Sequence, residues 1–82
     1  MTWNYRVLRH QIKRATGPPI YSYAIHEVYY DETNRVLGWT ASPVTLKAES
    51  LEELREDWEA MRMAFALPVF DPEAREEVRE NE

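Results

Sequence analysis

The two histidines, His10 and His26, are the side chains of this 82-residue chain best suited to metal or acid–base chemistry. A zinc site needs three or four protein ligands in a fixed geometry. His26 and Glu27 are neighbours in a predicted strand, so their side chains point to opposite faces and cannot chelate one ion together. The chain has no cysteine, which excludes thiolate catalysis and cysteine-ligated metals. We expect no metal site and no cofactor, and histidines that are partly buried or belong to a binding surface.

Carboxylates recur four residues apart, as Glu52 with Glu56 and Glu53 with Asp57. A general acid–base pair needs one carboxyl whose pKa is raised by burial. These acids fall on the polar side of a predicted helix, so we expect ordinary solvated carboxylates. The chain has only two glycines and no glycine-rich phosphate loop. We therefore predict no enzymatic activity, and interpret the acidic helix side as either solvated or a docking face for a basic partner.

Tyrosine and tryptophan are the residue types in excess, with 5 and 3 copies. In a predicted strand at residues 20–30, alternation places Tyr21, Tyr23 and Tyr29 on one face. One helix covers only one face of a small sheet, so some of these aromatics should lie on an open face and anchor an interface. The alternative is that residues 68–72 fold over that face. The predicted partner-binding residues are Tyr21, Tyr23, Tyr29, Trp39, Glu52, Glu56 and Asp57.

Three predicted strands position these side chains. Alternation along the chain indicates a strand at residues 3–8, and an aromatic and β-branched run indicates a second at residues 20–30. Between them, Gly17 and two prolines break the pattern. A polar turn at residues 31–35 leads to a third strand at residues 36–41.

A helix follows the strands. Ser50 and Glu53 have the spacing of a capping box, and Pro68 ends the helical pattern. One apolar stripe has helical spacing and consists of Leu51, Leu54, Trp58, Met61 and Phe65. Asp71 and Pro72 resemble the start of a second, short helix. We predict an α+β fold, a three-stranded antiparallel β-meander packed on one amphipathic helix. It forms a single domain over residues 1–70, with an acidic C-terminal tail or short helix at residues 71–82.

The charge is unevenly distributed around a net value of −5. The first 20 residues carry four bases and no acid, namely Arg6, Arg9, Lys13 and Arg14. A nucleic-acid contact through these four residues is an alternative function, although the acidic remainder of the chain would be repelled by phosphates. We find no secretory signal and no apolar run long enough to span a membrane. We expect a cytoplasmic protein that contacts no membrane.

The order of the elements, with the strand at residues 20–30 and the helix start Ser50-Leu51-Glu52-Glu53, resembles the N-terminal domain of HicB-type antitoxins over about residues 20–66. The resemblance implies neutralisation of a small basic RNase by direct contact. The partner would lie near the acidic helix and the sheet face around Tyr21, Tyr23 and Trp39. The final 12 residues are too short for the DNA-binding domain that often follows in this family. The whole chain also looks like other small bacterial proteins, a likeness that implies no mechanism.

The sequence thus predicts a non-enzymatic module that binds a protein. An antitoxin and a phage-encoded inhibitor of a host defence complex both belong to this class. The predicted partner is a basic protein, and a homodimer is the expected assembly.

Overall fold

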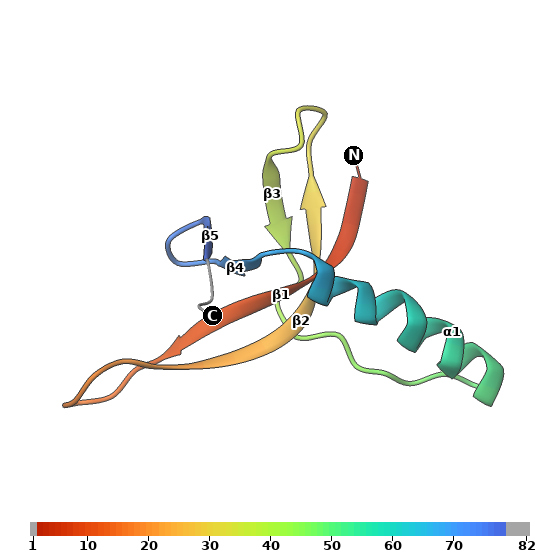
Figure 1. Ribbon diagram of the computed structural model, residues 1–82, viewed down its shortest axis with the longest axis horizontal. Coiled ribbons are helices and arrows are strands. Elements are labelled where there is room, and N and C mark those ends of the chain that lie inside the picture. The colour runs from red at the N-terminus through yellow and green to blue at the C-terminus, as the bar shows by residue number, and fades with distance from the viewer. Residues whose placement is uncertain (1, 79–82) are drawn as a thin grey trace.

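The computed structural model describes residues 2–78 of the chain (Figure 1). Within them lie five strands, one α-helix and one 3₁₀ helix. In chain order these are β1 (Thr2–Ile12), β2 (Ile20–Tyr30), β3 (Val36–Trp39), α1 (Leu51–Met61), η1 (Arg62–Ala66), β4 (Val69–Asp71) and β5 (Glu76–Val78).

A long antiparallel hairpin of β1 and β2 is the centre of the fold. The two strands pair along their whole length, from Thr2 opposite Tyr30 to Ile12 opposite Ile20. The predicted second strand is confirmed with its predicted bounds, whereas β1 runs four residues past the predicted end of the first. Gly17 has a φ of +92° at the tip of the hairpin, a value that glycine adopts without strain.

The prediction of a three-stranded antiparallel meander is wrong. The sheet has the strand order β3-β2-β1-β4-β5, and β4 runs parallel to β1, with Leu8 opposite Phe70. The physical reason is Phe70, which is only 3% exposed. Its ring enters the core when residues 69–71 join the free edge of β1, so this segment becomes a strand instead of a link.

The prediction of a short C-terminal helix is also wrong for the residues described. Asp71 Oδ1 accepts hydrogen bonds from the backbone N–H groups of Glu73 and Ala74, as a helix N-cap would. Arg75 then adopts a φ of +54°, and the chain reverses into β5. Asp71 therefore caps a turn here. An aspartate side chain favours such a turn as readily as it favours the start of a helix. Residues 79–82 of the predicted tail lie outside the described part.

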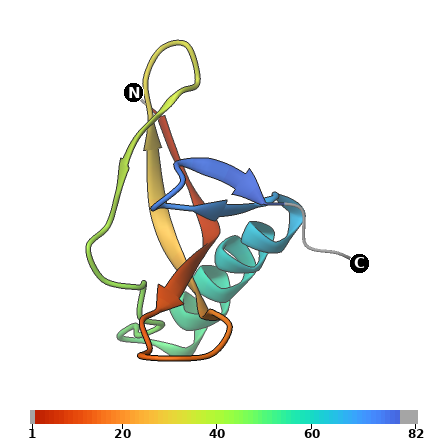
Figure 2. The same ribbon diagram turned by 90° about the vertical axis from the view of Figure 1, so that its left-hand side faces the viewer.

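The core lies within the curl of the sheet and needs no helix to close it. Leu8, Val28 and Phe70 are buried together, and Tyr30, Val36 and Trp39 pack against them. The five strands form a curled half-barrel, which Figure 2 shows from the side. The predicted packing of an amphipathic helix on the sheet is therefore wrong as an account of the core. We call the five strands the sheet body.

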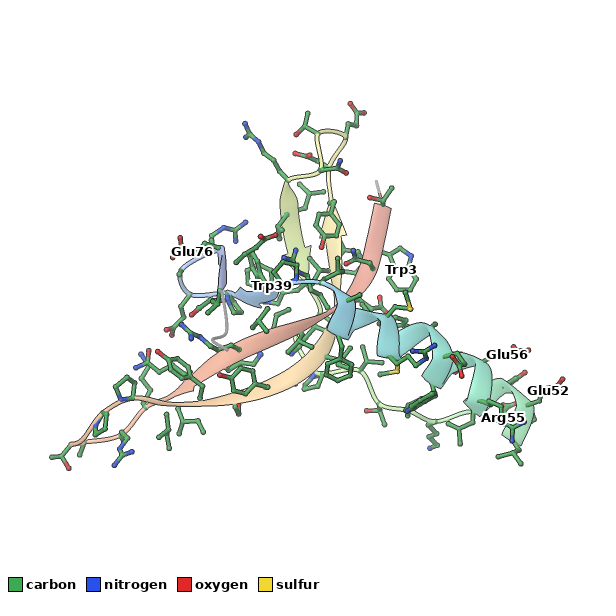
Figure 3. The ribbon with its side chains drawn as sticks, viewed as in Figure 1. Trp3, Trp39, Glu52, Arg55, Glu56 and Glu76 are labelled. Atoms are coloured by element: carbon green, nitrogen blue, oxygen red, sulfur yellow. The ribbon has the colours of Figure 1, made fainter. Side chains whose placement is uncertain are left out.

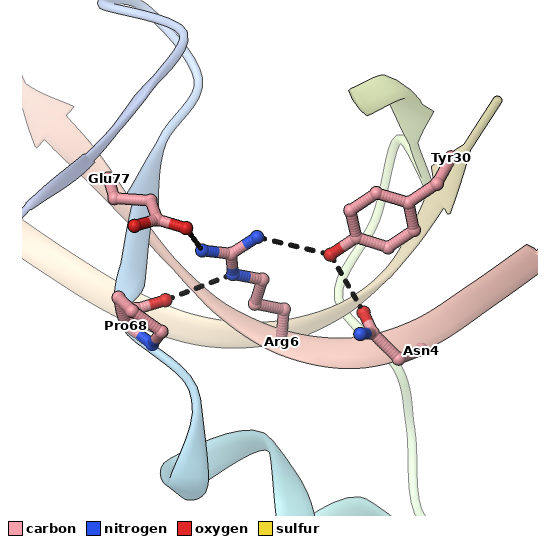
Figure 4. Close-up of polar contacts among 5 residues, drawn as sticks. All are labelled: Asn4, Arg6, Tyr30, Pro68 and Glu77. Atoms are coloured by element: carbon pink, nitrogen blue, oxygen red, sulfur yellow. Dashed lines mark hydrogen bonds and ion pairs between the residues drawn. The ribbon is translucent and has the colours of Figure 1, made fainter. Parts of the chain in front are cut away.

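A buried arginine links the two ends of the described chain (Figure 4). Arg6 Nε donates to the Pro68 carbonyl oxygen at 2.9 Å, and Nη2 pairs with Glu77 Oε2 at 2.7 Å. Nη1 donates to the Tyr30 hydroxyl, which donates in turn to Asn4 Oδ1. Burying a charge is tolerated only with such partners, so Arg6 fixes β1, β2 and the β4–β5 hairpin in one arrangement.

The helical segment meets the sheet body only at its C-terminal end. Val7 points away from the Leu8 side of β1 and is buried, as is Ala64 of η1, the helix that contacts β1. From there α1 extends away from the sheet, and the β1–β2 hairpin extends in a different direction (Figure 1).

Candidate functional site

Helix α1 begins where the sequence predicts. Ser50 Oγ accepts a hydrogen bond from the Glu53 backbone N–H at 3.1 Å, and Ser50 has an extended backbone. Glu52 and Glu53 lie in the first turn, where carboxylates interact favourably with the positive end of the helix dipole. These local interactions are sufficient to start the helix, but they contribute little to its stability.

The apolar stripe of α1 and η1 is largely exposed. Met61 is the one fully buried member, and Leu54 is partly covered. Leu51, Trp58 and Phe65 are 71%, 51% and 73% exposed. A helix of 11 residues is marginal in water unless its apolar face is packed. The sheet body does not supply that packing, so α1 presents an apolar face to its surroundings.

An open groove of about 490 Å³ runs along this face. Leu46 of the connection between β3 and α1 forms one wall, and the helix forms the other. The lining residues are Leu46, Leu51, Leu54, Arg55, Trp58 and Glu59. Sequence reasoning did not include Leu46. The signal in the sequence was that Leu46 is an apolar residue in a mostly polar connection, just before the helix cap at Ser50.

The predicted acidic residues lie on α1 but outside the lining of the groove. Glu52 and Glu56 project from the outer part of α1 together with Arg55 (Figure 3). Asp57 is on the side of α1 that approaches β1. The pKa of Tyr5 is raised mainly by burial, with smaller contributions from the charges of Glu27 and Asp57. Glu52 and Glu56 are four residues apart and share one side of α1, and neither lines the groove, whose charged residues are Arg55 and Glu59.

The three predicted tyrosines share one face of β2, the face on which α1 lies. Tyr23 is half exposed, and the Arg9 guanidinium lies over the ring of Tyr21 at 4.0 Å. The Tyr29 hydroxyl donates to Glu27 Oε1 at 2.7 Å, and this bond is the main cause of the raised pKa of Tyr29. The structure thus places the tyrosines and the helix on the same side of the sheet body.

Trp39 does not join this surface. Its ring packs on Phe70 at a centroid distance of 5.6 Å, and the Arg75 guanidinium lies over it. Figure 3 shows Trp39 in the sheet body, apart from Glu52 and Glu56. The predicted tyrosines thus lie on one face of β2 and the predicted acids on α1, which extends away from the hairpin, while Trp39 belongs to the core.

The four bases of the alternative nucleic-acid surface are not equivalent. Arg6 is buried in its own network, and Arg9 pairs with Asp71 Oδ2 at 3.0 Å. Burial by itself would raise the pKa of Asp71, but bonds from the Ala74 N–H, Arg9 and the Glu73 N–H outweigh it and lower that pKa. Lys13 and Arg14 are exposed near the hairpin tip. Two of the four charges are thus bound within the fold, which weakens the nucleic-acid alternative.

The two histidines form a pair inside the sheet. Their Nε2 atoms are 3.1 Å apart, and His26 Nδ1 is 2.9 Å from the Thr40 carbonyl oxygen. A carbonyl only accepts, so His26 Nδ1 carries hydrogen, and Nε2 of the neutral ring accepts from His10. Burial lowers the pKa of His26, opposed by the bond to Thr40 and reinforced by His10. Within residues 2–78, no group of three His, Cys, Asp or Glu side chains is placed to hold a metal ion.

Comparison of the chain with protein-family models, curated proteins and solved structures finds no match. The resemblance to HicB-type antitoxins therefore rests on the residues quoted for it and stays a prediction. In the described part of the chain, neither helical segment has the length and apolar character needed to cross a bilayer.

Proposed function

We propose that this chain is a non-enzymatic protein-binding module that docks its partner on helix α1. The observation that carries the proposal is the exposed apolar stripe, with Leu51 and Trp58 at 71% and 51% exposure beside an open groove. Large exposed apolar side chains that cluster beside a groove mark interaction surfaces in soluble proteins. Tryptophan is also the residue type most enriched among energetically dominant interface positions.

The net charge of α1 defines the class of partner. Between residues 50 and 62 the chain has five acids and two bases. Carboxylates on the same helix as the apolar stripe attract a basic partner and set its orientation, while burial of the apolar side chains provides most of the affinity. The partner that fits is a protein surface with apolar side chains surrounded by lysine or arginine.

An antitoxin-like or inhibitory role is the proposed use of this binding. A protein that covers a basic functional surface of another protein neutralises it without any chemistry of its own. The resemblance of the Ser50-Leu51-Glu52-Glu53 helix start to that of HicB-type antitoxins supports this role, and a phage-encoded inhibitor would work by the same contact. The proposal requires no cofactor and places the protein in the cytoplasm.

The test compares capture by the wild-type chain with capture by Leu51→Ser and Trp58→Ser variants. Tagged proteins retain partners from an extract of the source cells at low and high salt, and mass spectrometry quantifies them. We expect a basic protein held by the wild type and reduced at least about 30-fold for Trp58→Ser, the loss typical of a dominant interface residue. High salt should weaken retention by the wild type.

A Leu37→Ser variant is the matched control for Leu51→Ser. Leu37 is also an exposed leucine, but it lies on β3 and outside the groove. It should retain the partner as the wild type does. Equal retention by the wild type and both stripe variants would contradict docking on α1.

A further inference from the structure

A second pocket lies on the sheet body, and none of its lining residues belongs to α1. It is an open cavity of about 280 Å³ between the start of β1, the turn after β2 and the segment that leads into β4. Small-molecule sites in proteins usually have about 300–1,000 Å³, so this cavity suits a small ligand. Its polar lining residues are Thr2, Asn4, Arg6, Tyr30, Asn34 and Glu77.

The buried guanidinium of Arg6 is part of the pocket wall. Arg6 is only 4% exposed, and its side chain has five N–H donors. Within residues 2–78, three of these donors have an acceptor, namely the Pro68 carbonyl, the Tyr30 hydroxyl and Glu77 Oε2. Two N–H groups of a buried cation are therefore left for another acceptor.

The amide side chains beside Arg6 also have unused hydrogen-bond donors. Asn4 Oδ1 accepts from the Tyr30 hydroxyl, and this bond leaves the N–H groups of the Asn4 amide unoccupied. Asn34, in the turn after β2, makes no side-chain hydrogen bond to any residue between 2 and 78. Unused donors therefore outnumber unused acceptors in the pocket, which favours a ligand that offers acceptor oxygens.

A carboxylate of the chain itself indicates which chemical group suits Arg6. The ion pair joins Arg6 Nη2 to one oxygen of Glu77 at 2.7 Å, whereas a carboxylate pairs best with a guanidinium through both oxygens. The Glu77 side chain is 60% exposed, so water solvates it and it loses little on leaving the pair. The bonds to Pro68 and Tyr30 still hold Arg6 in place when Glu77 is displaced.

We propose that this pocket binds a small organic carboxylate, whose two oxygens replace the Glu77 carboxylate on Arg6. The amide N–H groups of Asn4 and Asn34 donate to the bound ligand. Glu77 is then a built-in competitor, which keeps the buried guanidinium paired while the pocket holds no ligand. The inference is independent of docking on α1, because the groove and this pocket share no lining residue.

The test is a titration of ¹⁵N-labelled protein with succinate, followed by amide chemical shifts, against sodium chloride of equal ionic strength. Glu77→Gln removes the competing charge and keeps an amide oxygen for Arg6. We expect this variant to lower the dissociation constant for succinate at least about 10-fold. Asn34→Gly removes the amide and fits the φ of +65° at this position, so it should raise that constant at least about 5-fold.

A Glu76→Gln variant is the matched control for Glu77→Gln. Glu76 is the neighbouring exposed glutamate of β5, it does not line the pocket, and its substitution changes the net charge by the same amount. It should bind succinate as the wild type does, and circular dichroism checks that all variants are folded. Tighter binding by Glu77→Gln alone supports the inference. Equal affinity in the two glutamine variants, or no succinate-specific shifts around Arg6 and Asn34, would overturn it.

Discussion

The sheet body and helix α1 differ in which side chains they bury. In the body, the polar groups that are buried are paired, and within residues 2–78 no buried side-chain nitrogen or oxygen lacks a partner. In α1, the apolar groups that helical periodicity gathers on one side stay in contact with solvent. The sheet body buries its own apolar side chains. Helix α1 has an apolar stripe like that of a helix packed in a protein core, but most of this stripe has no surface to pack against. Because the exposed apolar side chains of α1 contribute little to the core, they are the residues to test for a role in function.

The two phenylalanines test this comparison directly, because they differ in region and not in type. Phe70→Ala removes a core side chain that is 3% exposed and should cost about 3–5 kcal/mol in the free energy of unfolding. That is a large part of the stability of a small domain. Phe65→Ala, in η1 at 73% exposure, should change it by less than about 0.5 kcal/mol. Urea unfolding followed by circular dichroism measures both, and equal losses would remove the distinction between the regions.

The stability of the sheet body should depend on pH through the buried His26. The pKa of His26 is lowered in the folded protein, chiefly by burial, so the unfolded chain binds a proton first as the pH falls. Stability is therefore complete above the unfolded histidine pKa of about 6.5 and falls below it, by at most about 1.4 kcal/mol per pH unit, until the folded pKa is reached. We expect a lower urea midpoint at pH 5.5 than at pH 7.5.

A His26→Gln variant is the control for the pH effect. Its absolute stability can differ, but the slope between pH 5.5 and pH 7.5 should flatten, because the buried titrating group is gone. A slope that is unchanged in this variant would mean that another group carries the dependence.

The smallest predicted effect concerns the cap of α1. Ser50→Ala removes the bond to the Glu53 N–H and should destabilise the helix locally by about 1 kcal/mol. Because α1 packs so little on the body, the urea midpoint should hardly move while amide hydrogen exchange in residues 51–61 accelerates. An equal loss of protection in β1 and β2 would show that helix and body unfold as one unit, contrary to the comparison.

The elements with strong local signals were predictable from the sequence. Residues 20–30 alternate over a full strand, and Ser50 with Glu53 marks a helix start, and both appear where expected. The tyrosines on one face followed from the same alternation. These features depend on a few neighbouring residues, so the sequence contains what determines them.

The features that were missed depend on distant pairing. A three-residue strand such as β4 has too few residues to show a period, and its place beside β1 depends on Phe70 meeting Leu8, 62 positions earlier. Helical periodicity likewise places Leu51 and Trp58 on one side of α1, but it does not show which surface packs against that side. Trp39 was assigned to an interface for the same reason, since its neighbour in the core is Phe70.

The Arg6 network has a consequence for the order of events during synthesis. Arg6 is made before two of its partners, the Pro68 carbonyl and Glu77, which follow it by 62 and 71 residues. Phe70, which completes the core around Leu8 and Val28, also arrives late. The long hairpin can form on the ribosome, but with its apolar face uncovered, a state that invites association with other chains. The Arg6 network and the core can therefore close only after residues 68–77 have left the ribosome.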